Sequence, residues 1–186
     1  MALVLIVDDS PTDVHVMQKA LEQNGFRTAS AADGSEAIRK ARELHPDLIL
    51  MDIQLQGDLD GIQATEQIRA QADLPVIYLT AHSDERTLQR ARLTEPYGYV
   101  LKPFEDRELH MAIEIALYKY TSELKLRAHE RWLAATLKGI GEAVIATDAR
   151  QRIQFINPVA EALTGWAQAE AVGQAEADVL RLVDDS

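Results

Sequence analysis

Short apolar runs of about five residues recur along the first hundred positions, and polar stretches with helical spacing of apolar residues separate them. Uninterrupted runs of this length are typical of parallel strands that are covered on both faces. The expected strands are Leu3–Val7, Phe26–Ser30, Asp47–Met51, Pro75–Leu79 and Tyr97–Leu101. The pattern therefore predicts five strands that alternate with helices.

The intervening helices have recognisable ends. Ser10 before Pro11 suits an N-cap followed by a first-turn proline, and Asn24-Gly25 stops this helix. The four helices are expected at about 11–24, 33–45, 60–70 and 84–93. Strands joined through helices pair in parallel with right-handed crossovers, so we expect an α/β fold with a doubly wound, five-stranded parallel sheet.

A much longer helix is expected next, because neither proline nor glycine occurs from Glu105 to about Lys138. A helix of this length spans about 50 Å. Its apolar stripe consists of Leu109, Ile113, Leu117, Tyr120 and Leu124, and it resumes at Leu133, Leu137 and Ile140. This stripe favours a dimeric coiled coil over a core-facing helix with a solvated tail, because it continues beyond what the preceding α/β domain can cover and isolated helices are marginally stable in water.

The last segment, 139–186, has a different pattern. Ala143–Thr147 and Arg152–Ile156 are expected strands joined by a turn, and Asn157 before Pro158 is typical of the start of a helix that Gly165 ends. We expect a small α+β unit after the long helix.

Composition narrows the possible functions. The 186 residues include no cysteine, which excludes disulfides, thiolate catalysis and zinc–sulfur sites. The formal net charge is −11 without a basic patch, so we expect no nucleic-acid partner for this chain. No apolar run approaches the roughly 18 residues of a membrane span, and no secretory signal pattern is present, so we expect a cytoplasmic protein without a membrane partner.

Polar residues follow four of the expected strands. Asp8 and Asp9 come after the first strand, Asp52 after the third, Thr80 after the fourth and Lys102 after the fifth. Because the carboxyl ends of parallel strands share one edge of the sheet, these side chains are expected to converge. Three carboxylates would attract Mg²⁺, and Asp52 is then a plausible nucleophile toward phosphorus, with the Thr80 hydroxyl and the Lys102 ammonium suited to phosphoryl oxygens.

The motifs VDDS, LMD, YLTA and YVLKPF follow these strands in order, and over residues 1–121 the chain resembles the response-regulator receiver domain of two-component signalling. The resemblance implies a flavodoxin-like fold in which Asp52 is the phosphoacceptor. It also implies that Asp8, Asp9, Asp52 and the backbone carbonyl of Gln54 bind Mg²⁺.

The same resemblance implies that Thr80 and Lys102 contact the phosphoryl group and that the Lys102-Pro103 bond is cis. Tyr99 resembles the family's switch aromatic, which reorients as Thr80 moves toward the phosphoryl group. The loop IQLQGDLDG departs from the family pattern, because it lacks proline and places Gly61 nine residues after Asp52. We therefore expect a loop that is one residue longer. His82 lies near the site in sequence and is interpreted as a surface residue.

The segment IATDARQRIQFINPVAEALTGW resembles the start of a PAS sensor domain. The expected organisation is a receiver domain at 1–121, a helical linker at 105–138 that continues the last receiver helix, and the N-terminal part of a PAS domain at 139–186. About 50 residues follow the linker, which is about half of a PAS fold. We therefore expect an incomplete PAS domain, with no assignable ligand.

These observations predict a phosphoacceptor response regulator. Its expected partners are a cognate sensor histidine kinase or phosphotransfer protein and, through the helix after residue 105, a second copy of the chain. Beyond self-phosphorylation and autodephosphorylation, we expect no enzymatic activity in this chain. The alternatives are an Mg²⁺-dependent aspartyl-phosphate phosphatase, which the adjacent first-strand acids and the missing cap insertion disfavour, and a DNA-binding transcription regulator whose output lies beyond residue 186.

Overall fold

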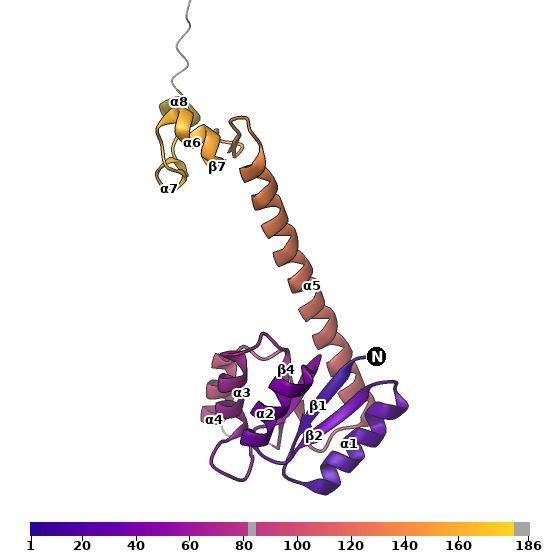
Figure 1. Ribbon diagram of the computed structural model, residues 1–186. Coiled ribbons are helices and arrows are strands. Elements are labelled where there is room, and N and C mark those ends of the chain that lie inside the picture. The colour runs from indigo at the N-terminus through magenta and orange to yellow at the C-terminus, as the bar shows by residue number, and fades with distance from the viewer. Residues whose placement is uncertain (82–84, 181–186) are drawn as a thin grey trace, which may run out of the picture. The chain divides into compact units, whose positions relative to one another are not determined.

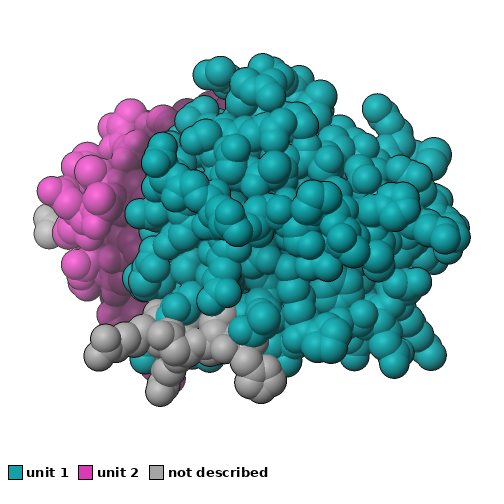
Figure 2. Space-filling model, turned by 90° about the horizontal axis from the view of Figure 1, so that it is seen from below, with its two compact units in different colours: residues 1–123 teal, residues 124–186 magenta. Residues whose placement is uncertain are grey.

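The computed structural model describes residues 1–81 and 85–180 (Figure 1). The chain divides into two compact units, Met1–Glu123 and Leu124–Ser186, which Figure 2 distinguishes by colour. The boundary between them falls inside the long helix α5, Asp106–Gly139. This helix confirms the expectation of a single long helix after the fifth strand.

The first unit is built on a parallel sheet with the strand order β2-β1-β3-β4-β5. The strands are β1 (Leu3–Val7), β2 (Arg27–Ala31), β3 (Leu48–Asp52), β4 (Val76–Thr80) and β5 (Gly98–Leu101). This order confirms the doubly wound, flavodoxin-like prediction, and it places the topological switch point between β1 and β3. All strands except β1 begin one residue later than their apolar runs.

Side-chain caps fix the beginnings of three helices. The side chains of Ser10, Asp33 and Asp60 each accept a hydrogen bond from the backbone N–H three residues further on. The helices of this unit are α1 (Pro11–Gln23), α2 (Gly34–Leu44), α3 (Gly61–Arg69), α4 (Glu85–Leu93) and the first part of α5. The predicted starts therefore hold for α1, α2 and α3, whereas Asp84, the expected start of α4, lies outside the described residues.

Helices cover both faces of this sheet (Figure 1). Successive residues of a strand point to opposite faces, so Val4 and Ile6 pack with α1 and α5, while Leu5 and Val7 pack with α2, α3 and α4. The central strands β3 and β4 are buried throughout. A sheet buried on both faces leaves the carboxyl ends of its strands as the place for polar groups.

The first part of the predicted apolar stripe on α5 belongs to the core of the first unit. Leu109 and Ile113 are completely buried in the core of the first unit, and Leu117 packs against the same cluster. Tyr120 is half-buried, and its hydroxyl donates a hydrogen bond to the carbonyl of Asp73 at 2.5 Å. The first part of the stripe therefore faces the unit's own sheet and is not available to a second copy.

Tyr97 extends this packing to the end of the first unit. Its hydroxyl donates a 2.6 Å hydrogen bond to Glu123, and its ring meets the ring of Tyr120 edge-on at 5.8 Å. The ammonium group of Lys119 lies 5.2 Å from the centre of the same ring. These contacts explain why the first unit includes α5 as far as Glu123.

After the end of α5, the described part of the second unit, up to residue 180, contains a small hairpin and three short helices. Antiparallel strands β6 (Ile145–Thr147) and β7 (Ile153–Ile156) are followed by α6 (Pro158–Thr164), α7 (Gln168–Ala171) and α8 (Glu176–Val179). A compact apolar cluster consists of Ile153, Ile156, Ala160, Ala171 and Val179. Asn157 and Gly165 cap α6 as the sequence predicts, and β6 is two residues shorter than expected.

Within residues 1–81 and 85–180, no helix is both long enough and apolar enough to cross a membrane.

Candidate functional site

Three carboxylates meet at the switch point of the sheet. Asp8 and Asp9 directly follow β1, and Asp52 is the last residue of the neighbouring strand β3. One oxygen of each lies within 4.8 Å of the others. Asp8 and Asp52 are buried, and Asp9 is half-buried. Parallel pairing of β1 with β3 thus brings together acids that are more than forty residues apart in sequence.

Lys102 supplies a positive charge to this acidic cluster. Its Nζ lies 2.6 Å from Asp8 Oδ2 and 2.5 Å from Asp52 Oδ2. The residue follows β5, and its backbone N–H donates to the carbonyl of Thr80 at 2.8 Å, so β4 fixes its position. The Lys102-Pro103 peptide bond is cis, which confirms the prediction from the family resemblance.

Backbone donors orient the other carboxylate oxygens. Ser10 N–H donates to Asp8 Oδ1, and Gln54 N–H donates to Asp52 Oδ1, both at 2.8 Å. Asp8 and Asp52 are therefore each held by Lys102 on one oxygen and by a nearby backbone N–H on the other. Gln54 contacts Asp52 through its N–H, and its carbonyl as a metal ligand stays a prediction.

The protonation of Asp52 and Lys102 reflects burial and mutual attraction. Burial raises the pKa of the Asp52 carboxyl, and this effect exceeds the opposing effects of the Lys102 and Gln54 hydrogen bonds. Burial alone would lower the pKa of Lys102, but hydrogen bonds and charge interactions with Asp52 and Asp8 hold it above its ordinary value. Lys102 therefore stays protonated at neutral pH. Any further positive charge placed near Asp52 would stabilise its ionised carboxylate.

Gly61 allows the loop after β3 to close tightly against the site. A Cβ at this position would lie 1.9 Å from the backbone oxygen of Asp52, so no side chain fits there. The Gly61 N–H donates to the carbonyl of Ile53 at 3.1 Å, which closes the loop, and Asp60 caps the helix that follows. The Asp60-Gly61 signal in the sequence thus marks a helix start and also a close approach to Asp52.

Thr80 and Tyr99 lie on the neighbouring strands β4 and β5. Thr80 ends β4, is buried, and pairs with Leu101 of β5. Tyr99 on β5 is 38% exposed, and its ring centre lies 5.9 Å from that of Tyr78 on the neighbouring strand. Burial of the Tyr99 side chain raises its pKa. His82 lies outside the described residues.

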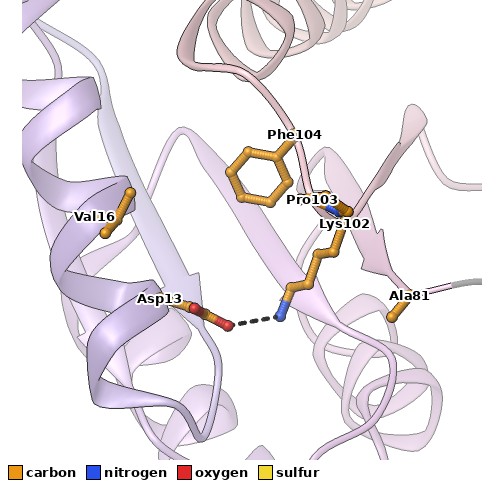
Figure 3. A pocket seen from close by; sticks show the side chains of 6 residues that line it. All are labelled: Asp13, Val16, Ala81, Lys102, Pro103 and Phe104. Atoms are coloured by element: carbon orange, nitrogen blue, oxygen red, sulfur yellow. Dashed lines mark ion pairs between the residues drawn. The ribbon is translucent and has the colours of Figure 1, made fainter.

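A pocket of about 440 Å³ opens beside Lys102 (Figure 3). Its lining includes Asp13 and Val16 of α1 on one side, and Lys102, Pro103 and Phe104 on the other. Asp13 forms a 3.6 Å ion pair with Lys102, drawn as the dashed line in Figure 3. Sequence reasoning missed Asp13, although its place three residues after the Ser10 N-cap puts it on the turn that faces the site.

The donor set fits a hard divalent cation. Carboxylate oxygens are the ligands that Mg²⁺ prefers, and Asp8, Asp9 and Asp52 supply three of them. Lys102 forms ion pairs with Asp8 and Asp52, and its single positive charge leaves the three carboxylates with an excess of negative charge. The Lys102 ammonium lies against the Asp8 and Asp52 oxygens, which shows that a cation is stabilised there. A divalent ion would neutralise the remaining charge.

The order of the sheet and the acidic cluster at its switch point define a flavodoxin-like domain with a cation site. Residues 4–114 match the model of the response regulator receiver domain, so the protein belongs to the response regulators of two-component signalling. Residues 133–185 match the model of the PAS fold. Both resemblances stated from the sequence are confirmed.

Relatives with this domain are numerous. The chain is 35% identical over 120 residues to the DNA-binding response regulator MtrA of Mycolicibacterium smegmatis, with 64% of this chain and 52% of that protein covered. The chain thus spans about half the length of this relative.

Solved structures give the same result for the first unit. The signal receiver domain of a modulated diguanylate cyclase from Desulfovibrio desulfuricans G20 is 37% identical with a TM-score of 0.63, and the match covers 66% of this chain and 98% of that chain. The N-terminal domain of a response regulator/sensory box/GGDEF 3-domain protein from Carboxydothermus hydrogenoformans is 34% identical, with a TM-score of 0.62 and the same coverage.

Proposed function

We propose that Asp52 accepts a phosphoryl group from a sensor histidine kinase or a phosphotransfer protein in an Mg²⁺-dependent reaction. The observation that carries this proposal is the convergence of Asp8, Asp9 and Lys102 on Asp52 at the switch point of the sheet. This arrangement combines a nucleophilic carboxylate with groups that bind a metal and groups that bind phosphoryl oxygens. Family membership supports the same role.

In the proposed step, a carboxylate oxygen of Asp52 forms a bond to phosphorus as the phosphorus–nitrogen bond of a phosphohistidine breaks. The departing imidazole takes the bonding electron pair and a proton, and the product is an acyl phosphate. Positioning and charge neutralisation provide most of the catalysis in such transfers. The hydrogen bond from Gln54 N–H holds Asp52 Oδ1, which limits rotation of the nucleophile.

Asp8, Asp9, Asp52 and the Gln54 carbonyl are the proposed ligands of Mg²⁺. When bound, the ion supplies charge neutralisation between the carboxylates and the phosphoryl oxygens. Lys102 then has a second role, because its ammonium group lies at the site and can pair with the new phosphoryl oxygens. The Thr80 hydroxyl is proposed to donate to another of these oxygens.

The readout is proposed to involve β4, β5 and α5. Thr80 would move toward the phosphoryl group, and Tyr99, whose ring lies beside Tyr78, would reorient. Tyr97, which directly precedes β5, donates a hydrogen bond to Glu123 of α5. A conformational change in β5 would therefore alter contacts of α5, the helix that leads to the PAS segment.

We infer further that the chain forms a homodimer through the helix after residue 105. The reactions inferred for this chain are self-phosphorylation and autodephosphorylation. We infer that neither a nucleic acid nor a membrane is its partner and that it is located in the cytoplasm. The similar N-terminal domain from Carboxydothermus hydrogenoformans comes from a protein described as a response regulator/sensory box/GGDEF 3-domain protein. That name supports a PAS module and an output domain after the receiver, and a DNA-binding output has its counterpart in MtrA.

Phosphorylation with acetyl phosphate tests the assignment of Asp52. With Mg²⁺ present, mass spectrometry of the intact chain should show the addition of one phosphoryl group. Asp52→Asn should reduce labelling to background because the amide lacks the nucleophilic oxygen, whereas Asp58→Asn, in the exposed part of the same loop, should be labelled normally. Removing Mg²⁺ with EDTA should also prevent labelling. Equal labelling of Asp52→Asn and the unaltered chain would refute the assignment.

A further inference from the structure

The pocket beside Lys102 contains a carboxylate that the proposed phosphoryl transfer does not use. Asp13 lies in the first turn of α1, and its Oδ2 is 3.6 Å from Lys102 Nζ. The same Nζ lies 2.5 Å from Asp52 Oδ2, so a single ammonium group separates the Asp13 carboxylate from the proposed phosphoacceptor. Among the described residues that line this pocket, Asp13 is the only acid. A group that enters the pocket therefore meets a negative charge there.

The other side chains around this carboxylate are mostly apolar. Val16 follows Asp13 by three residues on α1, and Pro103 and Phe104 line the pocket from the loop after β5 (Figure 3). Phe104 is half-buried and packs against the apolar core, which holds its ring in place. The pocket volume of about 440 Å³ is ample for a small aromatic ring. Such a ring could contact Phe104 and still reach a hydrogen-bond acceptor.

The pocket borders the place where a phosphodonor must release its leaving group. In an in-line transfer, the leaving group lies on the side of phosphorus that points away from the nucleophile. The pocket lining includes Lys102 and also Ala81, the residue after Thr80. It therefore adjoins both residues that are proposed to bind phosphoryl oxygens. A leaving group that points away from Asp52 has this pocket beside it.

We propose that the pocket receives the imidazole ring of the phosphohistidine donor and that Asp13 accepts a hydrogen bond from this ring. The proposal rests on the proposed function, because it needs phosphoryl transfer to Asp52. Before the transfer, the ring nitrogen that is not bonded to phosphorus takes a proton from solvent. An oxygen of Asp52 then bonds to phosphorus while the phosphorus–nitrogen bond breaks. The electron pair of that bond stays on its nitrogen, the proton stays on the other nitrogen, and neutral imidazole leaves.

The charge of Asp13 makes the site selective between two kinds of donor. A protonated imidazole ring is a cation with an N–H donor, so a carboxylate beside it is stabilising. The leaving group of an acyl phosphate is a carboxylate, which gains negative charge during transfer and offers no N–H. Asp13 repels such a group. Asp13 is therefore a specificity-determining residue that favours phosphohistidine over acyl phosphates.

Two small phosphodonors test this role on the intact chain. Rate constants for labelling are measured by mass spectrometry with monophosphoimidazole and with acetyl phosphate, both in excess Mg²⁺. Asp13→Asn should slow labelling by monophosphoimidazole and accelerate labelling by acetyl phosphate, so the ratio of the two rate constants should fall about tenfold. Asp13→Glu keeps the charge and should retain most of the ratio. Asp58→Asn removes one negative charge from an exposed position outside this pocket and should leave the ratio unchanged.

The ratio distinguishes this role from a structural one. Loss of the ion pair with Lys102 would change labelling by both donors in the same direction, and the fraction of folded protein cancels in the ratio. An unchanged ratio in Asp13→Asn overturns the proposal, as does an equal fall in Asp58→Asn. If neither donor labels Asp52 in the unaltered chain, the phosphoacceptor assignment fails and this proposal fails with it. That result is distinguishable from an unchanged ratio in a chain that both donors label.

Discussion

Single residues at the carboxyl edge of the sheet serve more than one purpose. Lys102 neutralises part of the charge on Asp8 and Asp52 and also forms the weaker pair with Asp13. Gly61 begins α3 and leaves space for the backbone of Asp52. The position of Asp52, the proposed phosphoacceptor, therefore depends on Lys102 and also on Gly61, for which no chemical role is proposed.

Gly61→Ala should destabilise the first unit by about 1 to 3 kcal/mol, because the added methyl group would meet the Asp52 carbonyl and force the backbone apart. Urea unfolding followed by circular dichroism measures this loss. Gly139→Ala is the matched control, since its Cβ would meet no atom within 4 Å, and it should change stability by about 0.5 kcal/mol or less. Equal stability of the two variants would contradict the close approach.

At the scale of elements, Asn157 joins the end of α5 to the hairpin and α6 of the second unit. Its side-chain oxygen accepts from the N–H groups of Val144 and Ala160, and its amide donates to the carbonyls of Leu137, Ile140 and Glu142. The side chain is completely buried. One residue thus satisfies backbone groups from three consecutive segments, which fixes how α5 leads into β6.

Asn157→Ala should destabilise the second unit by about 2 kcal/mol, because it removes the helix cap and leaves the backbone groups that Asn157 contacts, buried or part-buried, without this partner. Trp132 and Trp166 are the tryptophans of the chain and both lie in this unit, so intrinsic fluorescence during urea unfolding reports on it. Asn157→Ser keeps a cap acceptor and should lose less stability than Asn157→Ala. A loss below about 0.5 kcal/mol for Asn157→Ala would show that the network contributes little.

At the scale of the whole molecule, one helix belongs to both units. Its first part completes the core of the receiver, and the Tyr97–Glu123 hydrogen bond marks the end of that packing. The remainder, from Leu124, belongs to the second unit. The apolar core of the receiver, including the first part of α5, is formed within residues 1–123.

A chain shortened to residues 1–123 should fold, accept phosphate on Asp52 as the full chain does, and sediment as a monomer, because it lacks the part of α5 that carries the exposed Leu126 and Leu133. A chain shortened to residues 1–139 keeps the whole of α5 and should remain dimeric. Sedimentation velocity distinguishes the two species. If residues 1–123 still form a dimer, the interface lies on the receiver itself.

Much of this fold was predictable from the sequence because its signals are local. The apolar run Leu3–Val7, the caps Ser10, Asp33 and Asp60, and the helix end at Gly165 coincide with the observed elements. The convergence of Asp8, Asp9, Asp52 and Lys102 followed from parallel topology, since every strand of such a sheet ends at the same edge. The one-residue differences at strand starts arise because pairing with a neighbouring strand, rather than apolar content, sets where a strand begins.

Periodicity alone could not assign the faces of α5. Leu109 and Ile115 are similar in polarity, but the sheet covers the first and leaves the second exposed. The ion pair of Lys102 with Asp13 likewise depends on how α1 lies beside the loop after β5. The sequence by itself determined the elements and their caps, because those depend on neighbours along the chain, and it determined the edge at which Asp8, Asp52 and Lys102 meet, because alternating strands and helices imply a parallel sheet. The tertiary structure decided which side chains share a contact and which apolar face stays free, because packing brings together residues that are distant in sequence.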